Sequence, residues 1–468
     1  MIGLPFLLRR LRELRLVGDA GERALVREGI LTLADLDLAI AEGRAVAADA
    51  ALRRAAGVLP AEYRPVTLGR AWDILDAFID SLTRHCPALQ AIEASGPARR
   101  AEPIVTGFVI VARAADPALA IESISALPTA SNILYRSGSR ALVLFEGHEI
   151  DVRVATPGFY GSVLFTTTGP AAHVVAVLER GGRQPYASET EVYATAGLPC
   201  LPPETRDAAD AIDRALRRDV PALVRREDMR GDLHMHTTYS DGRDSLRRMI
   251  HAAHALGYEY IAITDHSEHA GAAHTLTDDE LGRQRDEIAD LRAHAPGMAV
   301  LHGIEVDILP DGTLDCDDAV LETLDVVLAS LHDAAGQDGD QLTRRCLAAI
   351  RHPLVSVITH PANQLVGRRP GYDMDYLAIY QAAAETGTAL EIDGAPTHLD
   401  LSGERAREAV RAGATVVIDS DCHRSRSLDR QMRMGVGTAR RGWVEPRHVL
   451  NTRAVGDVRA FIARKRAG

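Results

Sequence analysis

The stretch GDLHMHTTYSDG, residues 231–242, decides how the C-terminal half of this chain is interpreted. His234 and His236 lie two residues apart after a short apolar run, and Asp241 follows five residues later. Side chains two apart on a strand point to the same face, so both imidazoles would face one site. Alone, the pattern fits either a metal site or an ordinary strand that carries histidines.

The composition is that of a globular protein. The chain has 468 residues, 46% hydrophobic and 25% charged, and this length predicts several domains. Its apolar runs fall well short of the roughly 20 residues that a membrane span needs. The five cysteines are scattered without a CxxC pair, and the first apolar patch precedes its arginines, the reverse of a secretory signal. We therefore expect a cytoplasmic protein without a membrane partner.

The charge pattern restricts the chemistry. A net charge of −12 argues against wholesale wrapping by nucleic acid, although it leaves room for a local basic groove. Nearly every basic residue is arginine, and Lys465 is the only lysine. Mechanisms that need an internal lysine, such as a Schiff base or a carbamylated metal ligand, are therefore excluded.

Four segments are expected along the chain. Residues 1–62 read as short helices, with Gly29 in a turn that suits either a helix-hairpin-helix unit, whose amides hold a DNA phosphate, or a plain helical hairpin. Residues 63–205 alternate helices and strands. Residues 206–229 read as a helical linker, and 230–468 form the C-terminal domain.

Seven short apolar strands with intervening helical segments follow from residue 231. Repeated strand–helix units predict a parallel sheet, and this dense succession favours a barrel over an open sheet. The strands are GDLHMH (231–236), YIAITDH (260–266), VLHGIEVD (300–307), VVLASLH (326–332), VSVITHP (355–361), ALEID (389–393) and TVVIDSD (415–421).

Metal-ligand residue types recur where these strands end. The carboxyl ends of parallel barrel strands converge on one mouth, so these side chains are expected to meet there. Six histidines and three carboxylates placed in this way are not explained as scattered structural residues. The predicted metal ligands are His234, His236, Asp241, His266, Glu305, His332, His360, Asp421 and His423.

The number of ligands bears on the number of ions. Zinc and manganese take about four to six ligands each, so nine residues would either complete one ion with a surplus or build a cluster of two or three. Three divalent ions would bring about +6 against −3 from the carboxylates. The resulting positive pocket favours an anion such as phosphate, and the imidazole and carboxylate ligands suit both Zn²⁺ and Mn²⁺.

Residues 231–423 resemble the PHP (polymerase and histidinol phosphatase) domain of metal-dependent phosphoesterases. HMHTTYSDG, TDHS, GIEVDIL, SLH, THP and DSDCH match its ligand motifs in order. The resemblance implies a distorted (β/α)7 barrel with three divalent ions, Mn²⁺ or Zn²⁺ or both. It also implies ligand roles for the nine residues, with Glu305 as the bridge and with Asp421 and His423 in the catalytic centre.

The upstream segments resemble bacterial family X DNA polymerases, in which a nucleotidyltransferase core precedes a PHP domain. ASGPARR (94–100), HEIDVRVATPGFYGSVLFTTTG (148–169) and SETEVYATAGLPCLPPE (188–204) carry this likeness. The implied fold class is α/β: a small helical N-terminus resembling a helix-hairpin-helix, an α+β nucleotidyltransferase-like module and the PHP barrel.

The nucleotidyltransferase module departs from the pattern of that family. Its Gly-Ser turn is Gly96-Pro97 here, and two of its three metal aspartates fall at Gly107 and Val109. Only the third, Asp151, remains. Two-metal nucleotidyl transfer needs several carboxylates, so we expect polymerase activity to be lost.

The expected function is phosphoester hydrolysis by metal-activated water, in the form of a 3′→5′ exonuclease or 3′-end-processing enzyme in DNA repair. The expected partners are DNA 3′ ends, with gapped or nicked duplexes among the candidates. Arg368 and Arg369 either clamp a neighbouring phosphate in the catalytic centre or form a solvated turn.

Four alternatives remain. A small-molecule phosphatase of the histidinol-phosphate type would use the same metal site on a phosphorylated metabolite. An active family X polymerase/exonuclease would need the lost aspartates, and a DNA-end-binding scaffold would not need nine intact ligands. An amidohydrolase barrel also begins with His-x-His, but many of these bridge their metals with a carbamylated lysine, which this barrel lacks.

Overall fold

The computed structural model describes residues 4–62, 65–128, 132–268, 275–292 and 297–467. The chain forms two compact units, Met1–Val220 and Pro221–Gly468. This division does not test the domain boundaries expected at residues 62, 205 and 229, which stay predictions. Among the described residues, no helix is both long and apolar enough to cross a membrane.

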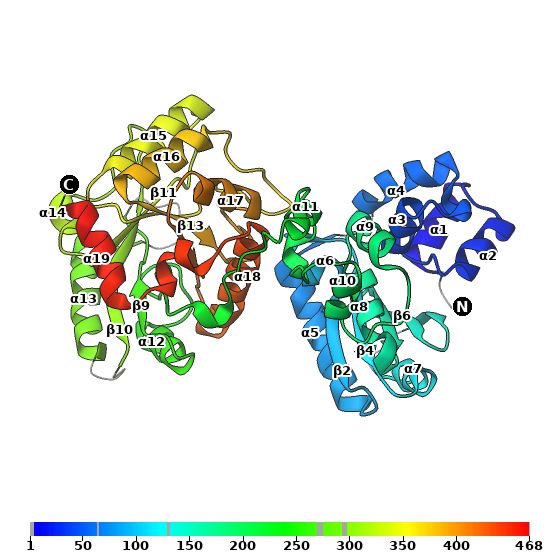
Figure 1. The fold of residues 1–468 in the computed structure, drawn as a ribbon. Coiled ribbons are helices and arrows are strands. Elements are labelled where there is room, and N and C mark those ends of the chain that lie inside the picture. The colour runs from blue at the N-terminus through cyan, green and yellow to red at the C-terminus, as the bar shows by residue number, and fades with distance from the viewer. Residues whose placement is uncertain (1–3, 63–64, 129–131, 269–274, 293–296, 468) are drawn as a thin grey trace. The chain divides into compact units, whose positions relative to one another are not determined.

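The unit Pro221–Gly468 is built on a seven-stranded parallel sheet whose strands are neighbours in chain order (Figure 1). The seven strands expected from the sequence and the α/β barrel are confirmed. The strands are β8 (Gly231–Asp232), β9 (Tyr260–Ile263), β10 (Ala299–Asp307), β11 (Val326–Ser330), β12 (Val357–Ile358), β13 (Ala389–Asp393) and β14 (Val416–Asp419).

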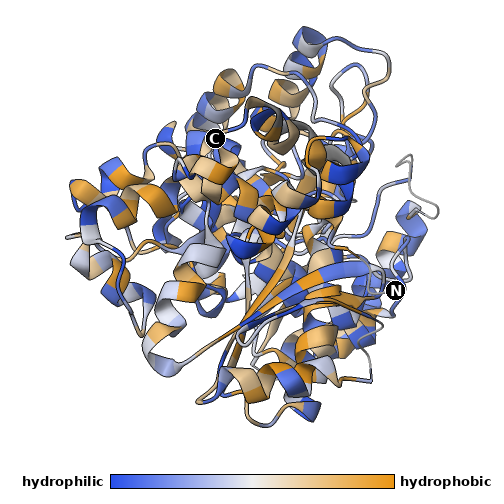
Figure 2. Cartoon of the chain, turned by 90° about the vertical axis from the view of Figure 1, so that its right-hand side faces the viewer, coloured by the Kyte–Doolittle hydropathy of each residue, from blue (hydrophilic) through white to orange (hydrophobic). Residues whose placement is uncertain are grey.

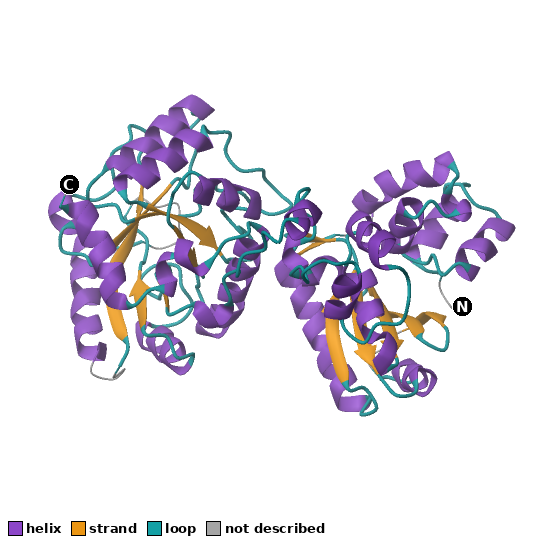
Figure 3. Cartoon of the chain, viewed as in Figure 1, coloured by secondary structure: helices purple, strands orange, loops and turns teal. Residues whose placement is uncertain are grey.

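Helices surround this sheet (Figure 3). They are α12 (Leu246–Ala255), α13 (Asp278–Arg292), α14 (Asp318–Leu321), α15 (Gly339–Arg351), α16 (Tyr376–Thr386), α17 (Gly403–Arg411), α18 (Leu428–Arg441) and α19 (Val455–Arg466). Helices of the chain carry both hydrophobic and hydrophilic residues, as amphipathic helices that cover a core do (Figure 2).

Local sequence signals fix the ends of these helices. Asp338 caps the N-terminus of α15 and forms a capping box with Gln341. Gly387 caps the C-terminus of α16, and its φ of +68° is a left-handed conformation that glycine adopts without a steric penalty. The polar and glycine residues between the strands therefore set where each helix begins and ends.

Side chains and one bridge join the first and last strands, which are not paired along their length. Met235 forms an isolated parallel bridge with Cys422, and the His236 amide donates to the Cys422 carbonyl at 3.0 Å. The buried Asn451 amide donates to the carbonyls of Gly231 at 3.0 Å and Ile418 at 2.5 Å, and its oxygen accepts from the Ile418 amide. These contacts curl the sheet into a nearly closed barrel.

The N-terminal unit contains a five-stranded mixed sheet in the order β2-β4-β7-β6-β5. Only β4 and β7 are parallel neighbours in it. Its strands are β2 (Ala91–Ser95), β4 (Phe108–Arg113), β5 (Asn132–Arg136), β6 (Arg140–Phe145) and β7 (His148–Ala155), and β1 (Val66–Thr67) pairs with β3 (Ile104–Val105). α5 (Leu68–His85), α6 (Gly96–Arg99), α7 (Pro117–Ser125) and α8 (Tyr160–Thr168) contact this sheet. The helices α9 (Ala171–Gly181), α10 (Glu189–Thr195) and α11 (Ala211–Leu216) follow, and α9 and α10 pack against α8.

Four helices precede this sheet: α1 (Phe6–Glu13), α2 (Asp19–Arg27), α3 (Leu33–Ala41) and α4 (Ala50–Glu62). The predicted turn between α2 and α3 contains Gly29 at a φ of +73°. α3 then begins at Thr32, which forms a capping box with Asp35. The apolar core of these helices includes Leu142 of β6, so they pack against the mixed sheet.

We call the junction between the first and last strands of the barrel the seam. We expect Asn451, which bridges this seam, to be a major contributor to stability. Replacing Asn451 with alanine leaves backbone groups of Gly231 and Ile418 without partners, so the free energy of unfolding should fall by about 3 kcal/mol. Urea unfolding monitored by circular dichroism measures this change. Arg459→Ala, on the exposed side of α19, is the matched control and should change stability by less than about 0.5 kcal/mol. An equal effect of both substitutions would contradict the role of the seam.

Candidate functional site

Strand parity places ligand-type side chains at the barrel mouth. In four strands, a buried apolar residue of the barrel interior is followed four positions later by a histidine or an acid. An even spacing keeps both residues on the inward face as far as the strand continues, as it does to Glu305 in β10, whereas His266, His332 and Asp421 lie just beyond the ends of their strands. The pairs are Ala262 and His266, Leu301 and Glu305, Leu328 and His332, and Val417 and Asp421.

The structure brings all nine predicted metal ligands together. They form four overlapping groups, within each of which the potential ligand atoms lie within 4.8 Å of one another. Their proximity is a property of the fold, while their individual ligand roles stay predictions. The groups are His236–Asp241–His266–His423, His234–His236–Asp421, His234–Glu305–His360 and His266–Glu305–His332.

Glu305 lies at the centre of these groups, and its side chain is almost fully buried. Its Oε1 lies 3.1 Å from His332 Nε2 and 2.9 Å from His360 Nε2. Its Oε2 lies 3.0 Å from His266 Nδ1, 3.4 Å from His234 Nε2 and 3.5 Å from His236 Nε2. The two oxygens therefore face different histidines, as a bridging carboxylate would.

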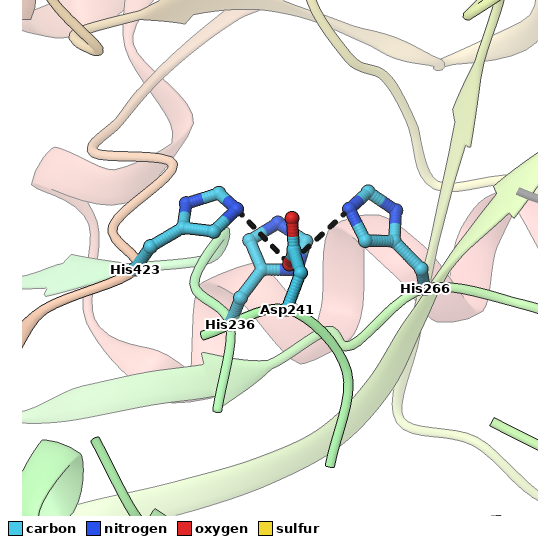
Figure 4. Close-up of side chains that lie close together, drawn as sticks. All are labelled: His236, Asp241, His266 and His423. Atoms are coloured by element: carbon cyan, nitrogen blue, oxygen red, sulfur yellow. Dashed lines mark ion pairs between the residues drawn. The ribbon is translucent and has the colours of Figure 1, made fainter. Parts of the chain in front are cut away.

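Asp241 and Asp421 supply the other carboxylates. Three imidazoles, of His236, His266 and His423, gather around the Asp241 carboxylate (Figure 4). Asp241 Oδ1 lies 3.1 Å from His423 Nε2 and 3.6 Å from His266 Nε2. Asp421 Oδ1 lies 3.1 Å from His236 Nε2. The segments that follow the first and seventh strands, β8 and β14, thus supply the donors that lie nearest the seam.

Two of the nine residues have left-handed backbones. The φ of His360 is +27° and that of Asp421 is +46°. Such conformations are unfavourable for residues other than glycine and cluster at functional sites. At His360 the turn also changes the register, because this histidine follows the interior residue Val357 by three positions instead of four.

The electrostatics of the site favour cations. Burial alone would raise the pKa of Glu305, but the imidazoles of His266, His332 and His234 hold it well below its usual range. Burial alone would lower the pKa of His332, whereas Glu305 and Asp307 raise it to about 10. The central carboxylate is thus ionised, and metal binding would displace protons from imidazoles.

Unpartnered buried atoms also fit metal binding. A buried polar atom without a partner costs about 1–3 kcal/mol, and a coordinated divalent ion would remove that cost. These nitrogen and oxygen donors are the types that zinc and manganese bind. Among the described residues, the buried atoms without a hydrogen-bond partner include Glu305 Oε2, Asp241 Oδ1, His236 Nδ1, His266 Nδ1 and His360 Nδ1.

Two carboxylates that the sequence did not single out orient the histidines. Glu391 of β13 accepts a hydrogen bond from His234 Nδ1 and another from the His360 amide, both at 2.7 Å. Asp307 lies against His332 Nδ1. A carboxylate on the far ring nitrogen fixes the tautomer of a metal-binding histidine. The inward parity of Glu391 with Ala389 was the signal that could have identified it.

Asp265 organises the loop that carries Asp241. Its carboxylate accepts hydrogen bonds from the Thr237 amide at 2.7 Å, from the Ser240 hydroxyl at 2.5 Å and from Gln284 Nε2 at 2.6 Å. The loop after β8 is therefore tied to the end of β9 and to α13.

Arg368 and Arg369 lie in the loop after β12, where both are exposed. Arg369 donates to the carbonyl and to the side-chain oxygen of Asn363, each at 2.9 Å. Asn363 in turn donates to the His332 carbonyl at 2.9 Å. Arg369 is thus held close to the mouth, and a phosphate-clamping role for the pair stays a prediction.

A separate arrangement surrounds Asp151 in the N-terminal unit. Asp151 is buried in β7, and its Cα is paired with that of Val109 in β4. Both of its oxygens accept from Arg140, at 2.8 and 2.9 Å, and one also accepts from Arg153 at 3.0 Å. Asp35 of α3 contacts the same two arginines at 2.6 Å. Guanidinium groups thus neutralise the only aspartate that remains of the expected three.

We expect Glu391 to tune the affinity of the site for metal. Glu391→Gln keeps the shape of the side chain but weakens the acceptor for His234 Nδ1, so affinity for Mn²⁺ or Zn²⁺ should fall about 10- to 100-fold. Competition with a chromogenic chelator measures the dissociation constants. Glu404→Gln, at the exposed start of α17, should leave them unchanged. Unaltered affinity in the Glu391 variant would contradict the orienting role.

Comparisons with known proteins identify the domain that contains this site. The family model described as "PHP domain" matches residues 232–409. The DNA polymerase/3′-5′ exonuclease PolX of Bacillus subtilis (strain 168) is 36% identical over 391 residues, which cover 79% of this chain and 68% of that protein.

Two shorter proteins each match about half of this chain. A protein named as a probable phosphatase from Thermoanaerobacter sp. (strain X514) is 29% identical over 247 residues, covering 50% of this chain and 95% of its own. A crystal structure of histidinol phosphate phosphatase from Lactococcus lactis subsp. lactis Il1403, complexed with zinc, L-histidinol and phosphate, covers 46% of this chain and 95% of its own at 19% identity and a TM-score of 0.37.

The relative from Bacillus subtilis matches across both units, and the PHP match lies within the barrel unit and contains seven of the nine donor residues, all but Asp421 and His423. The chain therefore belongs to the family of the bacterial DNA polymerase/3′-5′ exonuclease PolX and carries a C-terminal PHP domain.

Proposed function

We propose that this protein is a metal-dependent phosphoesterase that removes nucleotides from DNA 3′ ends. The observation that carries the proposal is the gathering of nine potential ligand residues at the barrel mouth, where five imidazoles lie within 3.5 Å of the two oxygens of the buried Glu305. Barrel enzymes place their chemistry at this end of the strands. The membership of the PolX family supports DNA as the substrate.

We assign three divalent ions, Mn²⁺ or Zn²⁺, to the donor groups. Asp241, His266 and His423 would hold one, and His332 and His360 with Glu305 Oε1 a second. The third would lie among His234, His236, Asp421 and Glu305 Oε2. Bound ions of this kind lower the pKa of water and offset charge on phosphate oxygens.

The residues of the chain bind and orient the substrate. Glu305 holds the histidines on both sides of the mouth in fixed positions, and Glu391 and Asp307 fix their ring orientations. Arg369, anchored on Asn363, and its exposed neighbour Arg368 would bind the phosphate next to the scissile bond. A strand of DNA offers such a second phosphate, whereas a small phosphomonoester does not.

A small phosphomonoesterase is the second candidate function. The observation that favours it is the relative named as a probable phosphatase, 95% of whose length is covered by its 247-residue match to this chain. That match covers half of this chain, which is more than the N-terminal unit, so it includes part of the barrel unit. A panel of phosphomonoesters, histidinol phosphate included, distinguishes the two functions when it is assayed beside a labelled oligonucleotide.

The central test is Glu305→Ala. Because this substitution removes the carboxylate shared by the donor groups, shortening of a 5′-labelled oligonucleotide in Mn²⁺ should fall by more than about 100-fold. Glu385→Ala, at an exposed position of α16, is the matched control and should retain full activity. Unchanged turnover in the Glu305 variant would contradict the proposal. Phosphate release from histidinol phosphate without shortening of the oligonucleotide would favour the second candidate.

We also expect no templated DNA synthesis. Gly107 and Val109 have no ligand for a cation, and Asp151 is already paired with Arg140 and Arg153. Primer extension with four deoxynucleoside triphosphates and Mn²⁺, in a His236→Ala background that suppresses the nuclease, should give no product. Extension that disappears in an additional Asp151→Ala variant would contradict this expectation and show that the module is active.

A further inference from the structure

The sixth strand, β13, has an acid at the position where other strands carry predicted ligands. Ala389 belongs to the barrel interior, and Asp393 follows it by four residues. The same spacing relates Leu301 to Glu305 and Val417 to Asp421. Asp393 therefore points to the mouth by the same strand geometry, although none of the nine residues comes from this strand.

The loop after β13 adds a histidine beside this acid. His398 stacks on His360, with ring centroids 5.4 Å apart and an interplanar angle of 28°. Gln364 Nε2 donates to the carbonyls of His398 at 2.9 Å and Leu399 at 2.8 Å, which fastens the loop to the end of β12. The loop backbone at His398 is thus fastened, and the imidazole rests against that of His360.

Asp393, His398 and Asp421 form a fifth donor group. Their potential ligand atoms lie within 4.8 Å of one another, as in the four groups of the nine-residue centre. Asp393 is fully buried, and its Oδ1 accepts the Ala395 amide at 2.5 Å. Its Oδ2 and the Nδ1 of His398 are buried without hydrogen-bond partners among the described residues. An unpaired buried carboxylate oxygen is costly, so its placement calls for a ligand.

We propose that Asp393, His398 and Asp421 bind a further divalent transition-metal ion, Mn²⁺ or Zn²⁺. The site shares Asp421 with the nine-residue centre, so the inference rests on the proposed metal binding of that centre. One imidazole and two carboxylates are donors that suit these two ions, whereas soft ions prefer thiolates. Three protein ligands leave coordination positions open, which is the arrangement of sites that also bind substrate oxygen.

The ion would lie on the β13 side of the mouth. Gln364, which fastens the loop of His398, belongs to the same segment after β12 as Asn363 and Arg369. The site therefore adds positive charge on the side where Arg369 is anchored. A phosphate next to the scissile bond is the chemical class of ligand that the open positions would take.

The test counts bound metal in the 468-residue chain. Wild type, His398→Ala and Asp393→Asn are each dialysed to equilibrium against Zn²⁺, and in parallel against Mn²⁺, and metal per chain is determined by mass spectrometry. Both variants should bind one equivalent less than wild type. Asparagine keeps the volume and the Ala395 contact of Asp393, so this variant tests the charged donor itself. His251→Ala, at an exposed position of α12, is the matched histidine control and should bind as wild type does.

Three outcomes separate the inference from the proposed function. Equal metal content in wild type, His398→Ala and Asp393→Asn, with ions lost in Glu305→Ala, would overturn the additional site and leave the proposed centre intact. Equal content in all four proteins would overturn the centre as well. If the remaining ions in His398→Ala bind more than about tenfold more weakly, His398 acts by positioning Asp421, and the separate site is overturned.

Discussion

The structure of the barrel depends on one constraint, the burial of the Glu305 carboxylate among five imidazoles. A buried charge is stable only when opposite charge or metal compensates it. Here each oxygen faces its own set of histidines, and Asp307 and Glu391 extend the network outward to further ring nitrogens. The strands, the seam and the left-handed turns at His360 and Asp421 all place donors around this carboxylate.

The buried carboxylates of the two units have different partners. At the barrel mouth, carboxylates face neutral or titratable imidazoles, which a metal can recruit by displacing protons. Around Asp151, the compensating charges are the permanent cations of Arg140 and Arg153, shared with Asp35 of α3. A guanidinium stays charged at all physiological pH values and occupies the carboxylate through directed hydrogen bonds. The first arrangement leaves donors that a metal ion could bind, and the second pairs both oxygens of Asp151 with arginines.

Much of this arrangement follows from sequence because parallel strands bring their carboxyl ends together. The order of the strands and the inward parity of Glu305, His332 and Asp421 were predictable, since strand period and barrel closure are general rules. Glu391, Asp307 and His398 were not identified, because contacts between different strands and loops define their roles. Asn451, which joins the first strand to the last, is likewise recognisable only once the barrel is closed. The ligand roles of the nine residues remain predictions.

The bridging position of Glu305 can be tested most directly by anomalous diffraction from crystals grown with Zn²⁺ or Mn²⁺, with data collected on both sides of the absorption edge of the metal. The account predicts separate anomalous peaks on the two sides of the carboxylate, each about 2.0–2.2 Å from one of its oxygens. A single peak that contacts only one oxygen would contradict the bridge. The absence of any peak at the barrel mouth would contradict the metal centre.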